Sequence, residues 1–139
     1  MFDKEKTLDL FKVVILEVGY LNPLRREVIG SVGTNTEEFG SFKVSLECIS
    51  SINMDPYLNI RKNTQYPAVF LTAGMNGPQV QPWMSGKFAA RLQNTDIHKN
   101  PISLFADFKA GYGESPNELK IYEEWSNILS FIFFANRTP

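Results

Sequence analysis

Few side chains in this sequence could act as a nucleophile or as a base at neutral pH. His98 is the only histidine and Cys48 is the only cysteine. A catalytic histidine needs a nucleophile and a carboxylate beside it, and a reactive thiol needs exposure and a nearby base. His98 stands in the polar segment Asp96–Lys99, which is typical of a solvated loop, and Cys48 lies in a segment of helical spacing, where we expect a buried structural thiol. A single cysteine forms no internal disulfide, and no Cys/His cluster could hold zinc, so we expect no metal and no cofactor.

The other candidates lie in two glycine-containing loops, 74–82 and 110–113. The second loop carries Tyr112, whose side chain has an unperturbed pKa near ~10 and is a poor base at neutral pH. Asp107 and Glu114 flank this loop, and we expect them to be a solvated pair of carboxylates. The glycine-rich stretch 30–33 is predicted to be a turn, because it lacks the lysine and the length of a phosphate-binding loop.

The positions of these loops depend on the strands and helices between which they lie. Short runs rich in valine, isoleucine and phenylalanine predict strands, and longer segments with apolar residues every three or four positions predict helices. In chain order the expected elements are a strand at 10–18, a helix at 37–52, a strand at 68–74, a helix at 84–92, a strand at 102–108 and a helix at 117–135. This order predicts an α/β fold with a parallel sheet covered by helices on its faces. In such sheets the functional loops follow the carboxyl ends of the strands.

The helical spacing also predicts which side chains face the core. For the helix at 37–52 these are Phe42, Val44, Leu46 and Ile49; for 84–92 they are Met84, Phe88 and Leu92; for 117–135 they are Leu119, Tyr122, Trp125, Leu129 and Ile132.

Composition and charge limit the class of protein. The 139 residues are 43% hydrophobic and 13% aromatic, which suits one globular domain over 1–139. Lys and Arg number 14 and Asp and Glu number 15, so the net charge is −1 and gives no ground to expect nucleic acid or anionic lipid as a partner. The adjacent pair Arg25 and Arg26 is expected on a solvated face. The apolar runs are too short to span a bilayer, and neither a signal sequence nor a disulfide framework is evident, so we expect no membrane association and a cytoplasmic location.

Several blocks of the sequence together resemble the prolyl oligopeptidase family. These blocks are Leu10-Phe11 with Val14-Ile15, Tyr66-Pro67-Ala68 through Gly74, Asn76-x-Pro78-x-Val80, Trp83-x-Ser85-x-Lys87-Phe88-Ala89-Ala90-Arg91-Leu92-Gln93 and Asp107-x-x-Ala110-Gly111-x-Gly113. They keep the order and the approximate spacing of the C-terminal part of that family's catalytic domain. The resemblance implies a partial α/β-hydrolase fold with a three-stranded parallel sheet. It also implies a serine, aspartate and histidine triad, in that chain order.

At the matched positions the triad residues are replaced. Gly77 stands where the family's Asn-Asp-Pro-Arg-Val segment has the triad acid, and Gln79 stands where that segment has a substrate-binding arginine. Tyr112 stands where the family's Ala-Gly-His-Gly segment has the base. The resemblance places the nucleophile turn before Leu10, and the sequence contains no Gly-x-Ser-x-Gly motif. Without acid, base or nucleophile, nearly all of the chemical rate should be lost.

Three hypotheses for function follow from these replacements. The chain is a non-catalytic module that self-associates or binds another chain, or an unproductive remnant, or a serine peptidase completed by another chain that supplies the nucleophile half. The resemblance also predicts a partner. In the family's fold the strand matched by 10–18 pairs on its outer side with the strand that leads to the nucleophile turn. An unpaired apolar edge would favour a symmetric dimer or capture by a larger protein.

Overall fold

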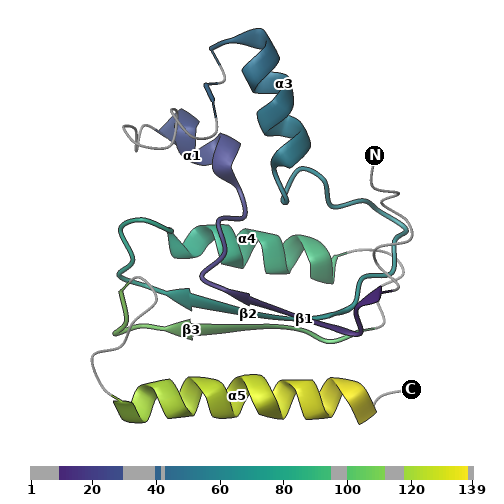
Figure 1. The fold of residues 1–139 in the computed structure, drawn as a ribbon, viewed down its shortest axis with the longest axis vertical. Helices are drawn as coiled ribbons and strands as arrows, with labels where there is room; N and C mark the ends of the chain where they lie inside the picture. Colours follow the sequence, from purple (N-terminus) through teal and green to yellow (C-terminus); the bar gives the residue numbers. More distant parts are fainter. Residues whose placement is uncertain (1–9, 30–39, 42, 95–99, 112–117, 138–139) are drawn as a thin grey trace.

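The computed structural model describes residues 10–29, 40–41, 43–94, 100–111 and 118–137. A parallel sheet of three strands forms its centre, in the order β1 (Val13–Glu17), β2 (Ala68–Gly74) and β3 (Ile102–Asp107). The helices are α1 (Pro23–Ile29), α3 (Ser45–Met54), α4 (Pro82–Gln93) and α5 (Glu118–Arg137). Figure 1 shows α4 and α5 on opposite sides of the sheet, while α1 and α3 extend away from it beyond α4. The predicted α/β fold with a parallel sheet is confirmed.

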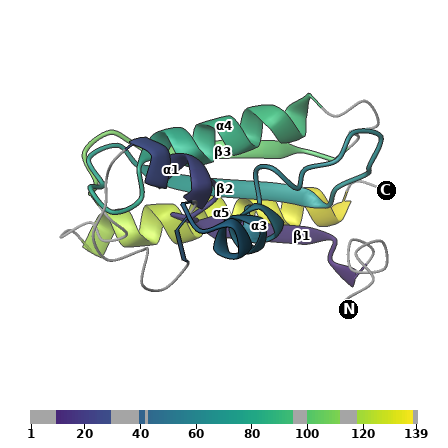
Figure 2. The ribbon, with the colours of Figure 1, turned by 90° about the horizontal axis from the view of Figure 1, so that it is seen from above.

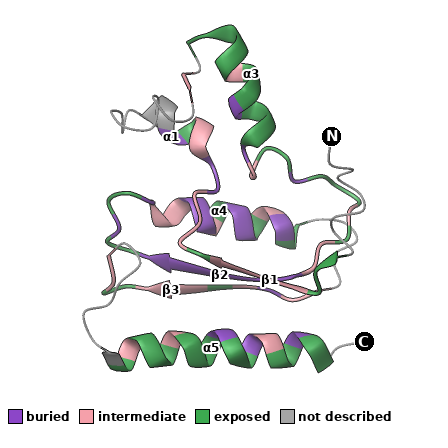
Figure 3. Cartoon of the chain, in the orientation of Figure 1, coloured by how far each residue is buried: buried purple, intermediate pink, exposed green. Residues whose placement is uncertain are grey.

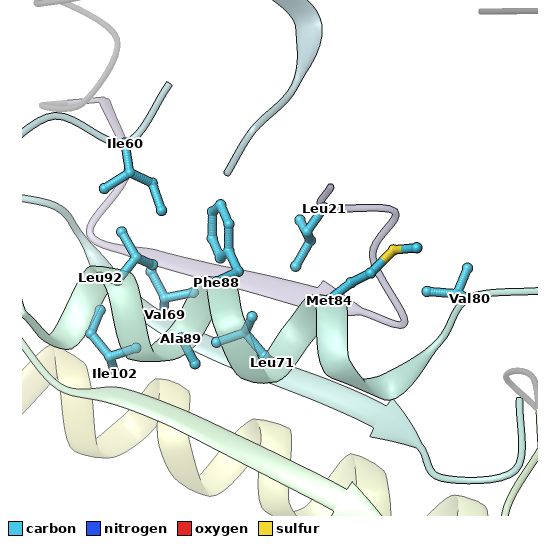
Figure 4. Close-up of a cluster of buried hydrophobic side chains, with 10 residues drawn as sticks. All are labelled: Leu21, Ile60, Val69, Leu71, Val80, Met84, Phe88, Ala89, Leu92 and Ile102. Carbon is cyan, nitrogen blue, oxygen red and sulfur yellow. The ribbon is translucent and has the colours of Figure 1, made fainter. Parts of the chain in front are cut away.

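Alternation along the strands divides the core between the two faces of the sheet. Val69 and Leu71 point toward α4 and pack with its residues Met84, Phe88 and Leu92, which form the larger of two hydrophobic clusters with them (Figure 4). Phe70, between Val69 and Leu71, points the other way and packs on Phe131 of α5, with ring centroids 5.2 Å apart. Because β2 lies between two strands and under two helices, all seven of its residues are buried, which explains why its sequence is apolar except at Thr72.

The sequence predicted the helix α5 but placed the wrong face of it against the sheet. Ile128, Phe131 and Ala135 are buried, whereas Leu119, Tyr122, Trp125 and Leu129 are exposed and Ile132 is half-buried. The helix carries apolar side chains on more than one face, so spacing alone does not say which of them meets β1 and β2. The other apolar side chains lie on the outer surface of α5, which Figure 3 shows as largely exposed.

The segment between β1 and β2 differs most from the expectation. Pro23 begins a helix, α1, that the sequence did not predict, and α3 covers 45–54 in place of the expected helix at 37–52. The expected core residues Val44, Leu46 and Ile49 are exposed, and Phe42 lies outside the described residues. Seen from above, α3 lies over the β1 side of the sheet (Figure 2), and its one buried residue is Ser51. This arrangement leaves the apolar face of α3 without a covering layer in the described part of the chain.

Arg26 also departs from the expectation of a solvated basic pair. Its side chain is 7% exposed, whereas Arg25 is exposed. The guanidinium lies over the ring of Tyr20, with Cζ 5.8 Å from the ring centroid, and its Nη2 donates to the carbonyl of Pro78 at 3.4 Å.

None of the helices in the described ranges is both long enough and apolar enough to cross a membrane.

Candidate functional site

The loops that follow β2 and β3 are joined through their backbones. The amide of Met75 donates to the carbonyl of Asp107 at 2.9 Å, and the amide of Asn76 donates to the carbonyl of Ala110 at 3.1 Å. The side-chain amide of Asn76 adds a bond to the carbonyl of Phe108 at 3.1 Å. Parallel strands end at the same edge of a sheet, and these bonds hold the two loops in contact there.

Glycines allow this close approach. Gly77 is buried, its amide donates to the carbonyl of Gly74 at 3.2 Å, and a Cβ atom added to it would lie 3.0 Å from the Val80 oxygen and 3.6 Å from the Gly111 carbon. The matched acid position therefore lies beside the residue that precedes the matched base position. Tyr112, Glu114 and His98 lie outside the described residues.

Asp107 organises the start of the β3 loop from the end of its strand. Its Oδ1 accepts the amides of Lys109 at 2.7 Å and Ala110 at 3.1 Å, and its Oδ2 pairs with Nζ of Lys120 on α5 at 3.0 Å. The amide of Lys109, and next the bond from Lys120, lower the pKa of Asp107 below its ordinary value. Asp107 is half-buried, and both of its carboxylate oxygens are bonded. Glu114 lies outside the described residues, so the expected solvated pair stays a prediction.

A cavity of about 380 Å³ opens between the ends of β2 and β3 and the first turns of α5. Its polar side chains are those of Thr72, Asp107, Lys109, Lys120, Glu123 and Glu124. Burial, and next the charge of Glu17, raise the pKa of Glu124 above its ordinary value, although a hydrogen bond with Thr72 acts in the opposite direction. Glu124 was not singled out from the sequence, because only the packing of α5 brings it to the end of the sheet.

The remaining predicted positions differ in their surroundings. Gln79 is exposed, and its neighbour Pro78 is fixed through its carbonyl by the buried Arg26. Cys48 is partly buried on α3, away from the two loops (Figure 1). No group of three or more His, Cys, Asp or Glu side chains that could hold a metal ion occurs among the residues that the structure describes.

The sequence is similar to those of known proteins. The chain is 28% identical over 127 residues to a prolyl endopeptidase of Elizabethkingia miricola, which covers 91% of this chain and 18% of that protein. It is 30% identical over 98 residues to dipeptidyl aminopeptidase BI of Pseudoxanthomonas mexicana, covering 70% of this chain and 13% of that protein.

Solved structures share the fold of this chain. A structure from a study of two prolyl endopeptidases superposes with a TM-score of 0.87 at 25% identity, covering 94% of this chain and 19% of that one. Oligopeptidase B of Leishmania major superposes with a TM-score of 0.84 at 22% identity over 94% of this chain and 18% of that one. The chain thus spans less than a fifth of the length of these relatives. The family model for the prolyl oligopeptidase family matches residues 4–134, and the chain belongs to that family.

Proposed function

We propose that the 139-residue chain, taken by itself, is a catalytically inactive prolyl-oligopeptidase-like domain that acts by binding another protein chain. The observation that carries the first half is the buried Gly77, which stands at the matched acid position inside a loop still bonded to its neighbour. The loops that would bring an acid beside a base are in contact, but the acid position has no side chain to orient or charge-balance a histidine.

The other matched positions support the same proposal. Tyr112 replaces the base, and its phenol is protonated near neutral pH unless its pKa is strongly lowered. Gln79 replaces the substrate-binding arginine, and an amide cannot form the charged fork that grips a carboxylate or carbonyl. These 139 residues also hold no Gly-x-Ser-x-Gly motif.

The free edge of β1 supports the binding half of the proposal. β1 pairs with β2, and no other strand pairs with it in the described ranges. The carbonyl of Lys12 accepts the amide of Ala68, and backbone groups alternate along a strand, so those of Val13, Ile15 and Glu17 point to the free edge. The occupant that we propose is a second copy of this chain, whose β1 would pair antiparallel across a two-fold axis.

One observation favours a rival function. The two loops keep their mutual bonds without a nucleophile turn in these 139 residues, so a chain that brings the nucleophile half to the β1 edge could complete a serine peptidase. In that case Gly77 and Tyr112 would still be unsuitable as acid and base, which is why the inactive domain is the better-supported proposal.

The experiment compares the purified chain with the prolyl endopeptidase of Elizabethkingia miricola. Both are incubated with a fluorogenic peptide that contains proline and with a fluorophosphonate probe for activated serines. We expect turnover and labelling of the relative and neither for this chain at equal concentration. Turnover or labelling of the chain would disprove inactivity, and activity that appears only after another protein is added would favour the completed peptidase.

A further inference from the structure

A concave surface outside the two loops gathers positive charge. A cavity of about 470 Å³ lies between the outer side of α4 and the segment that leads toward β2. Four cationic side chains line it, namely Arg61, Lys62, Lys87 and Arg91, and no aspartate or glutamate does so among the described residues. The chain as a whole has a net charge of −1, so this surface is much more positive than the protein is on average.

Neutral groups hold the two inner cations in place. Nζ of Lys87 lies 4.4 Å from the centroid of the Tyr57 ring, and Cζ of Arg91 lies 4.6 Å from the same centroid. Nη2 of Arg91 donates to the carbonyl of Ile60 at 3.3 Å, and Nζ of Lys87 donates to Oδ1 of Asn22 at 3.4 Å. Residues 87 and 91 lie one turn apart on α4, so both heads reach the same cavity.

Among the residues that the structure describes, no carboxylate forms an ion pair with these four side chains. Across the described ranges the one ion pair is Lys120 with Asp107, on the other side of the sheet from α4. Asp55 lies behind Asn22, and its Oδ2 accepts from the Asn22 side chain at 2.9 Å and from the Leu24 amide at 3.2 Å. Its Oδ1 accepts the amide of Leu58 at 3.0 Å, so both oxygens are bonded, and Asp55 does not line the cavity.

We propose that this cavity binds a small anion that carries two linked phosphate groups. Four clustered cations repel one another, and a multiply charged anion relieves that repulsion more than one carboxylate does. The remaining donors of Arg91 suit the oxygens of a phosphate, and the lysines supply point charges for a second group. Lys87 and Arg91 already cover the Tyr57 ring. The anion is therefore recognised by its charge and not by a nucleobase stacked on that ring. This site is independent of the proposed function.

The test is a calorimetric titration of the whole chain with inorganic pyrophosphate, compared with orthophosphate and malonate at equal ionic strength. We expect pyrophosphate to bind most tightly. Arg91→Gln should weaken it at least about tenfold, because a charge-assisted fork is lost. Lys62→Gln should weaken the binding of pyrophosphate several-fold. Because Lys62 is exposed, this substitution should leave the fold intact, so unfolding would not explain the loss of binding. The matched control is Arg137→Gln, an equal change of charge at the exposed end of α5 on the opposite side of the sheet.

The proposal is overturned by any of three results. These are no heat of binding with pyrophosphate, an equal loss of affinity with Arg137→Gln, or equal affinity for malonate and pyrophosphate. The variant Arg91→Lys separates the fork from the charge: it should retain part of the affinity, and a complete loss with the fold intact would show that charge is not what the cavity recognises.

Discussion

The Cα atom of Gly74 lies so close to the carbonyl oxygen of Gly111 that a Cβ atom at position 74 would overlap it. The end of β2 and the β3 loop therefore meet backbone to backbone, at a distance that no side chain fits. The amide of Asn76 and the carbonyl of Ala110 are joined at 3.1 Å beside this contact. A glycine at position 74 is thus a requirement of the junction that places Gly77 beside Gly111.

Gly74→Ala should destabilise the protein by about 1–3 kcal/mol, the usual cost of overpacking, because backbone atoms must move apart. Gly86→Ala is the matched control, since a Cβ atom there meets nothing within 4 Å and alanine suits the interior of α4. That control should stabilise the protein by roughly 0.5–1 kcal/mol. Urea unfolding measures both changes in the free energy of unfolding. Equal stability of Gly74→Ala and the unmutated chain would show that the two loops are not in contact.

The fold could be predicted from the sequence where burial is complete. The strand at 68–74 was predicted with its correct ends, because a strand buried on both faces has an almost entirely apolar sequence. The stripe of Met84, Phe88 and Leu92 was also correct, since α4 has one apolar face. For α5 several faces are apolar, and only the position of the sheet decides that Phe131 is inside and Trp125 outside.

The candidate site was predicted only in part, and for a physical reason. The resemblance gave the positions Gly77 and Gln79, but the Gly74–Gly111 contact joins segments that are distant in the chain, and spacing carries no information on it. The burial of Arg26 depends in the same way on its contacts with Tyr20 and with the carbonyl of Pro78.

Asp107→Asn should lower the stability at neutral pH by a modest amount. Amides and Lys120 lower the pKa of Asp107 below its ordinary value of 3.8, so its stabilising contribution is present above pH 3.8 and is lost as the pH falls through the lowered pKa. The difference in melting temperature between variant and unmutated chain should therefore disappear in acid. Glu123→Gln, an exposed neighbour of the same charge on α5, is the control and should show no such pattern. A difference that persists at the lowest pH would assign the loss to packing.

Glu124→Gln should have the opposite effect. Burial, and next Glu17, raise the pKa of Glu124 above its ordinary value of 4.5, so its ionised form opposes folding at neutral pH. The penalty is complete above the raised pKa and absent below pH 4.5. Replacement should therefore raise the melting temperature at pH 7 and leave it unchanged near pH 3. A lower melting temperature at pH 7 would mean that the bond with Thr72 outweighs burial.

The double variant Gly77→Asp with Tyr112→His should still show no peptidase activity in the 139-residue chain. A base and its orienting acid have no Gly-x-Ser-x-Gly serine to activate here. The assay is hydrolysis of a fluorogenic peptide that contains proline. A Cβ atom at position 77 would lie 3.0 Å from the Val80 oxygen, so circular dichroism must show that the double variant folds, and Tyr112→His alone serves as the second variant. Turnover by either would contradict the prediction.

The last prediction concerns association through the free edge of β1. Backbone groups of Val13, Ile15 and Glu17 point outward, and in the described ranges no strand pairs with them. Apolar side chains on the outer surface of α5, including Trp125 at 53% exposed, lie on one side of the same sheet. An unpaired edge beside an apolar surface favours pairing with a second chain. At micromolar concentration we therefore expect sedimentation to give a mass above that of the 15.8 kDa monomer.

Hydrogen exchange of the backbone amides identifies the surface that associates. The amides of Val14 and Leu16 face β2 and should exchange slowly at every protein concentration. The amides of Val13, Ile15 and Glu17 should exchange rapidly in dilute solution and slow down as the concentration rises, because pairing with a second β1 satisfies them. If association occurs while Ile15 remains fast, the outer surface of α5 is the interface in place of the edge. A monomer at all concentrations with a slow Ile15 amide would mean that another part of the same chain already covers β1, and the proposed binding role would then lose its structural basis.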